Sequence, residues 1–463
     1  MKTVFTLIIF FLCLSVYSQN QNKAGRLDSS FGKDGKVLTS FSNSFPDCAA
    51  ASTMNDGSII TAGTITFSNA VDTGGFLALK YSASGVLDTT FGNKGMSFIK
   101  GAGTGQAIAI QSDNKIIIGG YGANFSSSFI TIVRLNASGN IDSTFGNNGI
   151  ISTDDGQNCH DITIQKDGKI LIFGEDNMSF LTMRCLTNGT LDQIFGVGGI
   201  VKTSFGGHPA NGNAIAVDAN GKIVVAGDDG ESVLLARYNT DGTLDQSFGQ
   251  EGKIVSNLTT HIDDIYDIAL QSDGKIVATG ASSTFNRSNV LLVRYLSNGS
   301  LDNGFGISGF VVSKLPYSSL SKRLVLQSDN KIVVCGYAIN DSIYGHFLIE
   351  RYMSNGALDS SFNGNGYEIT EMDQSDAANA ILIQQTGKIV LAGSARETPP
   401  NPLVYLIALT RYDNDQSNKQ AIITKIRHWL QHHNGIMWNK VNDINNYVVQ
   451  RSYDGIHFKS IAR

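Results

Sequence analysis

The amino-acid sequence predicts an all-β protein, a seven-bladed β-propeller built from four-stranded antiparallel blades. Three observations lead to this fold class: a phrase that recurs seven times, a two-residue turn that recurs seven times, and four strand-like runs in each interval. Successive copies of the phrase are 50 to 60 residues apart. This spacing is typical of propellers and other repeat arrays, whose single units cannot bury their own apolar faces.

The recurring phrase is represented by residues 242–255, GTLDQSFGQEGKIV. Its Asp245 can accept backbone N–H groups in a tight turn, and Gly249 and Gly252 allow backbone angles that other residues avoid. A calcium loop would need several oxygen ligands per copy, and each copy has one dependable carboxylate. We therefore predict a structural joint that links the last strand of one blade to the first strand of the next. The seven aspartates of this joint are Asp28, Asp88, Asp142, Asp192, Asp245, Asp302 and Asp359.

Four strand-like runs follow one another in each unit. In the fifth unit they are residues 253–258, 267–273, 275–280 and 290–296. The third run is almost wholly apolar, which suits a strand covered on both faces. Two-residue turns that tolerate positive φ separate the second run from the third, so these strands should be antiparallel neighbours. The turns are Asp56-Gly57, Asp113-Asn114, Asp167-Gly168, Asn220-Gly221, Asp273-Gly274, Asp329-Asn330 and Thr386-Gly387.

Seven sheets of four strands predict a propeller over residues 24–415. A solenoid is the alternative, although its coils are usually shorter. The phrase at 27–35 has no blade before it, so we predict that Leu27 and Phe31 close the ring beside the seventh blade. Each unit's last strand ends in a basic residue that we expect at the rim, where charge discourages edge-to-edge pairing. These residues are Lys80, Arg134, Arg184, Arg237, Arg294, Arg351 and Arg411.

The whole series LDxxFGxxG, QSDGKIVVAG and LLARYNxDG resembles the delta-60 repeat family of exported bacterial propellers. The similarity covers roughly residues 24–415. The resemblance implies a propeller fold without an established activity, and it supplies no catalytic residues.

The N-terminus predicts a signal peptide over residues 1–18. Lys2 provides the charged start, residues 4–16 form the apolar stretch, and residues 16–18 suit cleavage. The apolar stretch is too short to span a bilayer, although a retained anchor is the alternative. No other stretch is long and apolar enough to cross a membrane. We expect a protein that is secreted or displayed on the cell surface, without a transmembrane segment.

Residues 419–463 differ in composition from the repeats and contain both tryptophans. With a turn at Asn434-Gly435, this part resembles the first half of a fibronectin-type β-sandwich of the kind found in exported Bacteroidetes proteins. About four of the seven strands of such a sandwich precede Arg463. His428 and His432 would lie too far apart along a strand to share a metal ion.

Composition and motifs exclude several function classes. A net charge of −5 and a pI near 5.9 offer no basic surface to nucleic acid. No phosphate-binding, dinucleotide-binding or zinc-protease motif occurs in a supporting context, so we predict no cofactor, no metal and no catalytic residue. Four cysteines lie outside the predicted signal peptide, and their spacing matches no zinc site. They lie in strand-like runs, which predicts buried thiols, and Cys159 with Cys185 is the one plausible local disulfide pair. These cysteines are Cys48, Cys159, Cys185 and Cys335.

Loops that break the sevenfold pattern are the best candidates for a ligand site, because rigid scaffolds place recognition in loops. Connections between the first and second runs, and between the third and fourth, vary most in length and should share one face of the ring. The candidate ligand-binding residues there are His160, His208, His261, Asp154, Asp155, Asp263 and Asp264.

The favoured function is an exported, non-catalytic binding or scaffold propeller that presents variable loops to an extracellular glycan or protein. The alternative is a propeller hydrolase or lyase that acts on polysaccharide. An enzyme would need a carboxylate pair, or a histidine, with a perturbed pKa in the site.

Overall fold

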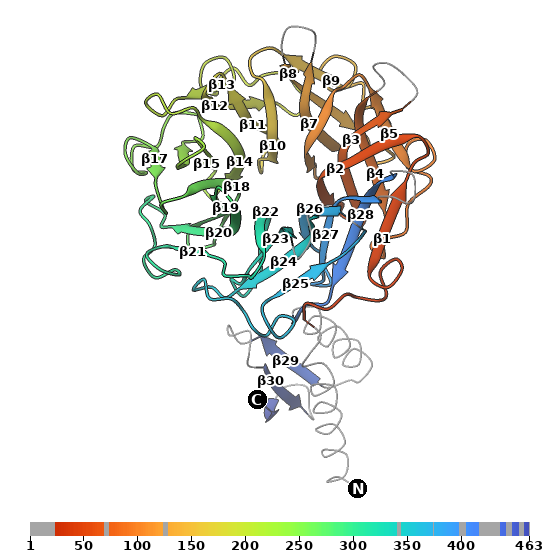
Figure 1. Cartoon of the computed structure of the whole chain (residues 1–463), viewed down its shortest axis with the longest axis vertical. Helices are drawn as coiled ribbons and strands as arrows, with labels where there is room; N and C mark the ends of the chain where they lie inside the picture. The colour runs from red at the N-terminus through yellow and green to blue at the C-terminus, as the bar shows by residue number, and fades with distance from the viewer. Residues whose placement is uncertain are drawn as a thin grey trace.

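A computed structural model describes residues 24–68, 74–123, 128–339, 344–373, 375–397 and 404–415, together with three short strands near the C-terminus. Seven four-stranded antiparallel sheets stand side by side in a closed ring (Figure 1). The prediction of a seven-bladed β-propeller is therefore confirmed.

The four strands of each blade follow one another from the innermost, beside the ring axis, to the outermost. Blade one contains β2 (Ser44–Thr53), β3 (Ile59–Phe67), β4 (Gly75–Tyr81) and β5 (Met96–Lys100). Blade two contains β6 (Thr104–Ile110), β7 (Ile116–Ala123), β8 (Ser128–Leu135) and β9 (Ile150–Thr153). Blade three contains β10 (Asn158–Ile164), β11 (Ile170–Asp176), β12 (Ser179–Cys185) and β13 (Ile200–Thr203). Blade four contains β14 (Asn211–Val217), β15 (Ile223–Asp228), β16 (Val233–Tyr238) and β17 (Lys253–Ser256). Blade five contains β18 (Ile262–Leu270), β19 (Ile276–Thr284), β20 (Arg287–Tyr295) and β21 (Phe310–Val312). Blade six contains β22 (Ser318–Leu326), β23 (Ile332–Ile339), β24 (His346–Tyr352) and β25 (Tyr367–Thr370). Blade seven contains β26 (Ser375–Ile383), β27 (Ile389–Glu397), β28 (Val404–Tyr412) and β1 (Lys36–Ser40).

The strand order corrects the predicted position of the phrase. The strand after each phrase is the fourth, outermost strand of a blade, and the three strands before the phrase are the first three strands of that same blade. The phrase therefore connects the third and fourth strands within one blade. The prediction that it joins successive blades along the chain is wrong. The repeat unit read from the sequence starts one strand earlier than the blade does. A series of four strands that repeats along the chain can be divided at any of the four strands, and the sequence does not mark which division is the blade.

Ring closure follows from this shift. β1 pairs with β28 from Lys36↔Thr410 to Ser40↔Leu406, so the first strand of the chain completes the last blade. Phe31 is fully buried in the apolar cluster between blades seven and one, as predicted. Leu27 packs instead at the seam between blades six and seven.

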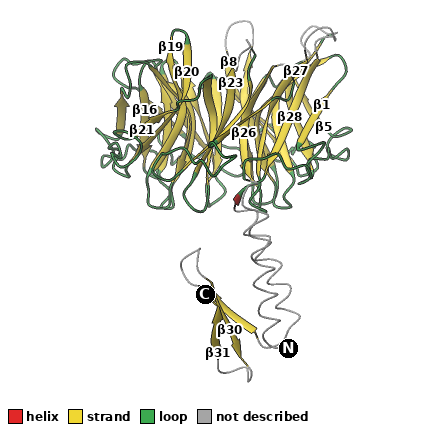
Figure 2. Ribbon diagram, turned by 60° about the horizontal axis from the view of Figure 1, so that its bottom comes forward, coloured by secondary structure: helices red, strands yellow, loops and turns green. Residues whose placement is uncertain are grey.

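The phrases and the two-residue turns lie on one side of the ring, which we name the phrase face. The connections between successive blades and the hairpins between second and third strands lie on the opposite side, which we name the variable-loop face (Figure 2). The predicted separation of constant and variable loops onto two faces is therefore correct.

A charged contact repeats on the phrase face, and blade four illustrates it. Asp245 Oδ2 accepts hydrogen bonds from Arg237 Nε at 2.7 Å and Lys222 Nζ at 2.6 Å, while its Oδ1 accepts from the Ser247 hydroxyl at 2.7 Å. The Arg237 guanidinium stacks on the Phe248 ring at 4.5 Å and donates through Nη1 to the Ser297 carbonyl of blade five. The phrase therefore joins neighbouring blades through this contact, which we name the clamp, and not through the covalent chain.

The clamp overturns the predicted rim position of the arginines. All six arginines at the ends of the third strands are buried, and Arg351 is fully buried, because each pairs with its phrase aspartate. In blade two, burial by itself raises the pKa of Asp142, but hydrogen bonds from Thr144 and Lys115 and the charge of Arg134 lower it to about 2. The carboxylate therefore stays ionised at neutral pH, and its stabilisation is lost only in acid.

All four described cysteines are buried free thiols, as predicted. The three strands near the C-terminus, β29 (Ile436–Lys440), β30 (Tyr447–Ser452) and β31 (Phe458–Ala462), form one antiparallel sheet in that order. The predicted signal peptide, His428, His432 and the Asn434-Gly435 turn lie outside the described residues. Within the described part of the chain, no helix has the length and apolar character that a membrane crossing requires.

Removal of β1 should open the ring. A chain that starts at residue 42 loses the β1–β28 pairing and Phe31, whose burial alone is worth about 3–5 kcal/mol. We expect its melting temperature to fall by roughly 10 °C or more, and a peptide of residues 24–41 should restore part of this loss by pairing with β28. A chain that starts at residue 24 is the control. Equal melting temperatures of the two chains would contradict closure by β1.

The clamp can be tested against its weakest copy. Asp245→Ala leaves the buried Arg237 without its carboxylate, which should lower the free energy of unfolding by about 3–5 kcal/mol. Blade one has Lys80 in place of the arginine, 3.5 Å from Asp88 and more exposed, so Asp88→Ala should cost only about 1 kcal/mol. Chemical denaturation of both variants measures the difference. Equal losses would mean that the arginine does not strengthen the joint.

Candidate ligand-binding site

The innermost strands leave one side open to solvent around the ring axis. In blade four, every residue of β15 and β16 is buried, whereas β14 alternates between buried and more exposed residues. The same alternation occurs in β18 of blade five. Side chains on the axial side of these strands can therefore meet a ligand.

Each inner strand has a β-bulge at the same place, seven residues before its two-residue turn. A bulge turns a side chain away from the regular strand pattern, and all seven bulge residues are partly exposed. We name this set the bulge ring: Ala49, Gln106, His160, Asn213, Tyr266, Lys322 and Asn379. No two neighbours in the ring are alike, so it provides an asymmetric surface on a nearly sevenfold scaffold.

His160, a predicted site residue, belongs to the bulge ring in blade three. Its Nε2 lies 3.0 Å from Glu175 Oε2 on the neighbouring strand β11. Asn158 Nδ2 donates to the other carboxylate oxygen at 2.6 Å. Burial raises the pKa of Glu175, but the hydrogen bond and charge of His160 and the Asn158 amide outweigh it and lower the pKa. Glu175 is therefore held ionised beside the histidine.

Blade four adds a buried carboxyl with the opposite pKa shift. Asp228 accepts hydrogen bonds from Asn211 and from the bulge residue Asn213, both at 3.0 Å. Burial raises the pKa of Asp228 to about 6 against the Asn211 hydrogen bond, and the negative charges of Asp264 and Asp229 contribute to the rise. Part of the Asp228 population is therefore protonated in mildly acidic solution.

Blades five and six complete the group. Tyr266 donates to Asp264 Oδ2 at 3.2 Å, and Lys322 Nζ lies over the Tyr266 ring at 4.4 Å. Burial raises the pKa of Asp264, with a contribution from the charge of Asp263. Burial and the charge of Arg323 lower the pKa of Lys322. We name the group formed by blades three to six the axial cluster: His160, Glu175, Asn213, Asp228, Asp264, Tyr266 and Lys322.

Deeper on the inner strands, two aspartates join neighbouring blades. Asp161 Oδ2 accepts the Ile215 N–H of blade four at 2.9 Å, and Asp267 Oδ2 accepts the Leu324 N–H of blade six at 2.8 Å. Burial raises the pKa of Asp267 to about 7, although the charge of Arg323 opposes this rise. These carboxyls use their oxygens on backbone N–H groups, so we assign them a structural role below the axial cluster.

The other predicted residues do not gather at the axis. His208 lies in the exposed loop before blade four, and its Nδ1 is 2.5 Å from Oδ2 of Asp229, which lies between β15 and β16. Asp263 is fully buried and accepts from the Thr259 backbone N–H and hydroxyl, so it holds its own loop instead of facing a ligand.

Asp154, Asp155 and His261 are exposed in the connections before blades three and five. The structure thus brings His160 and Asp264 into one cluster and leaves the other five predicted residues in the surrounding loops or beneath them.

Sequence reasoning missed Glu175, Asn213, Tyr266 and Lys322 as parts of this site. Their strands read as regular, and a bulge has no signature of its own in a single repeat. The signal was the comparison between repeats, because the position seven residues before each turn changes in every neighbouring blade while the turn itself is nearly constant.

The axial cluster offers three carboxyl groups, an imidazole, an amide, a phenol and an ammonium group in one place. Such groups can bind a ligand with many hydroxyl or amide groups. Among the described residues, no group of histidine, cysteine, aspartate and glutamate side chains could hold a metal ion. Asp228 beside Asp264 is also the kind of carboxyl pair that general acid–base catalysis uses.

Four segments of the chain match a family model described as a β-propeller domain of unknown function, DUF5122: residues 111–145, 219–248, 271–305 and 327–362. Each segment begins just before or at the two-residue turn and ends at the phrase phenylalanine, so the match covers the elements of the clamp. Together with the seven blades, it supports membership of a propeller family. Among curated proteins, none matches the sequence significantly.

Several solved structures are similar in fold. One is a protein of unknown function from Dyadobacter fermentans, with 11% identity, a TM-score of 0.45, and coverage of 83% of this chain and 100% of the other. Virginiamycin B lyase from Staphylococcus aureus has 12% identity, a TM-score of 0.47, and coverage of 81% and 98%. Sqt1 from Chaetomium thermophilum has 9% identity, a TM-score of 0.42, and coverage of 79% and 96%. These likenesses concern the fold alone.

The pKa values of the neighbouring carboxyls Asp228 and Asp229 should be shifted in opposite directions, upward for Asp228 and downward for Asp229. Carboxyl-carbon NMR on aspartate-labelled protein should give Asp228 a midpoint near pH 6, and Asp229 a midpoint below 3.8 because Ser232, Glu231 and His208 lower its pKa against its burial. A pKa raised on folding gives stability that is present below about pH 4 and lost as the pH rises through about 6. Asp228→Asn should flatten this part of the melting-temperature profile. A midpoint near 4 for Asp228 would contradict the site electrostatics.

Proposed function

We propose that the protein is an exported, non-catalytic binding propeller of the delta-60 repeat type, which presents its variable-loop face to an extracellular glycan or protein. The observation that carries this proposal is the bulge ring. A nearly sevenfold scaffold changes its side chain in every neighbouring blade at one axial position, and only an asymmetric surface can recognise one specific partner.

The proposal places the protein outside the cytoplasm, secreted or at the cell surface. Lys2 and the apolar residues 4–16 support export. The C-terminal segment would then be part of a fibronectin-type module that accompanies the propeller.

The chemistry of the axial cluster supports a ligand that is neutral or positively charged. Its three carboxyl groups, Glu175, Asp228 and Asp264, outnumber the single ammonium of Lys322. An anionic chain such as a polyuronate would meet repulsion there, whereas the hydroxyl groups of a neutral glycan or the amides of a protein loop would meet acceptors and donors.

A second candidate function is hydrolysis of a neutral polysaccharide. The observation that favours it is Asp228, whose pKa of about 6 and coupling to Asp264 suit a general acid beside a second carboxylate. A lyase acting on uronates is less well supported, because its substrate carboxylate needs cationic neutralisation.

Binding should depend on the axial cluster and not on the phrase face. On an array of glycans and secreted proteins, the Tyr266→Ala/Lys322→Ala variant should lose at least about tenfold in affinity for whichever ligand the wild-type protein binds, because both side chains are central contacts. Asp273→Ala, in an exposed turn of the phrase face, is the matched control.

Sugar release followed on the same array separates the two functions. Turnover by the wild-type protein that disappears in Asp228→Asn, with binding retained, would establish the hydrolase. Full affinity in the Tyr266→Ala/Lys322→Ala variant and loss of affinity in Asp273→Ala would place the ligand on the phrase face and contradict the proposal.

A further inference from the structure

The clamp of blade three lacks one hydrogen bond that four of its counterparts make. In blades two, four, six and seven, Nη2 of the clamp arginine donates to a hydroxyl two residues after the phrase aspartate. These pairs are Arg134 with Thr144 at 3.1 Å, Arg237 with Ser247 at 3.3 Å, Arg351 with Ser361 at 2.9 Å and Arg411 with Ser30 at 3.0 Å. In blade three this position is Ile194, which has no hydroxyl.

Arg184 therefore keeps a spare donor. Its Nε donates to Asp192 at 2.8 Å and its Nη1 to the Thr240 carbonyl at 2.5 Å, but its Nη2 makes no hydrogen bond within the described part of the chain. Arg184 is only 4% exposed. A guanidinium that is this deeply buried usually has all its N–H groups satisfied, so the spare donor marks a place for an acceptor.

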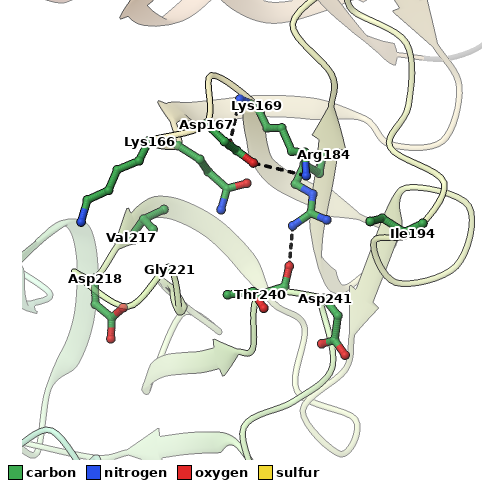
Figure 3. A pocket seen from close by; sticks show the side chains of 11 residues that line it. Lys166, Asp167, Lys169, Arg184, Ile194, Val217, Asp218, Gly221, Thr240 and Asp241 are labelled. Carbon is green, nitrogen blue, oxygen red and sulfur yellow. Dashed lines mark hydrogen bonds and ion pairs between the residues drawn. The ribbon is translucent and has the colours of Figure 1, made fainter.

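A hollow of about 370 Å³ opens beside this donor on the phrase face, at the seam between blades three and four (Figure 3). Arg184, Ile194, Val217 and Thr240 lie around it. Its volume lies within the range of small-molecule sites.

The hollow exists because two side chains of blade four are short. Three residues before the two-residue turn, blade four has Val217, where five of the other blades have isoleucine or leucine. At the next position it has Asp218, where five blades have glutamine and blade one has methionine. Blade five also lacks the hydroxyl, since Gly304 replaces it, but the longer Leu326 and Gln327 of blade six stand at its seam.

The lining combines an apolar wall with unpaired polar groups. Val217 and the 75% exposed Ile194 supply the apolar wall. The side-chain carbonyl oxygen of Gln165 is buried without a hydrogen-bond partner.

The two lysines of the lining are occupied by other partners, and its aspartates Asp218 and Asp241 accept hydrogen bonds from nearby backbone N–H groups. Lys166 donates to the Ala219 carbonyl at 3.0 Å, and Lys169 lies 3.3 Å from both Asp167 and Asp192. The unpaired donor next to an apolar wall is therefore the recognition element of the hollow.

We propose that this hollow is a second binding site, independent of the variable-loop face, for a small organic acid with an aliphatic chain. The carboxylate accepts from Arg184 Nη2, and the chain lies along Ile194 and Val217. A charge-assisted hydrogen bond to a buried guanidinium is stronger than a neutral one, so the acid is preferred to the alcohol of the same length.

Hexanoate tests the site as a probe, with hexan-1-ol and hexylammonium as matched ligands of other charge. In NMR titrations of the full chain, the amide signals of Gly221 and Thr240 should shift with hexanoate at concentrations at least about tenfold lower than with hexan-1-ol. Hexylammonium should not shift them. Equal responses to hexanoate and hexan-1-ol would overturn the recognition of a carboxylate.

Two variants and one control locate the probe. Ile194→Ser restores the hydroxyl of the other clamps and should abolish hexanoate binding without lowering the melting temperature. Val217→Ile/Asp218→Gln fills the hollow with the side chains of the other blades and should also abolish binding. Ile307→Ser removes an equally exposed isoleucine from the phrase of blade five and should leave the affinity unchanged. Retained binding in either of the first two variants, or loss in the third, would overturn the proposal.

Discussion

The buried ion pair between the phrase aspartate and the arginine of the preceding strand holds this ring together. Covalently, the phrase stays within one blade. Physically, it reaches the next blade, because the same guanidinium that pairs with Asp245 also donates to the Ser297 carbonyl and stacks on Phe248. A guanidinium can do all three at once because it is planar and has several donors. Lysine in blade one cannot, and its pair with Asp88 is longer.

This contact explains why the two faces of the ring differ so strongly. The clamp, the two-residue turns and the phrase glycines all lie on the phrase face, so the requirements of folding act mainly there. Among the residues that the structure describes, the variable-loop face has no contact between blades that recurs in every seam. Its blades are joined near the axis by individual bonds, such as Asp161 to the Ile215 N–H and Asn213 to the Ile265 carbonyl. Bulge-ring side chains that make no such bond can therefore differ from blade to blade without loss of the joint.

The sequence was sufficient to predict what is repeated. Seven phrases and seven turns predict seven blades, and Phe31 was placed correctly at the closing seam. The strand order could not be predicted, because a cyclic repeat has no internal mark for the start of a blade, and the β1–β28 pairing appears only when the ends of the repeat region meet. The burial of the arginines was missed because a basic residue at a strand end usually faces solvent; only its match with a carboxylate eight residues later, as in Arg237 and Asp245, indicates a pair.

The axial cluster and the hollow beside Arg184 share a cause, although they lie on opposite faces. In a ring of nearly independent blades, stability is close to a sum of local blade and seam contributions, so a single seam can lose one hydrogen bond while the other clamps keep the ring closed. Ile194 and Asp218 are such local departures on the phrase face, and His160 and Asn213 are departures on the axial side of the same two blades. Redundancy in the repeated contact is what allows individual side chains of blades three and four to depart from the sevenfold pattern while the ring stays closed.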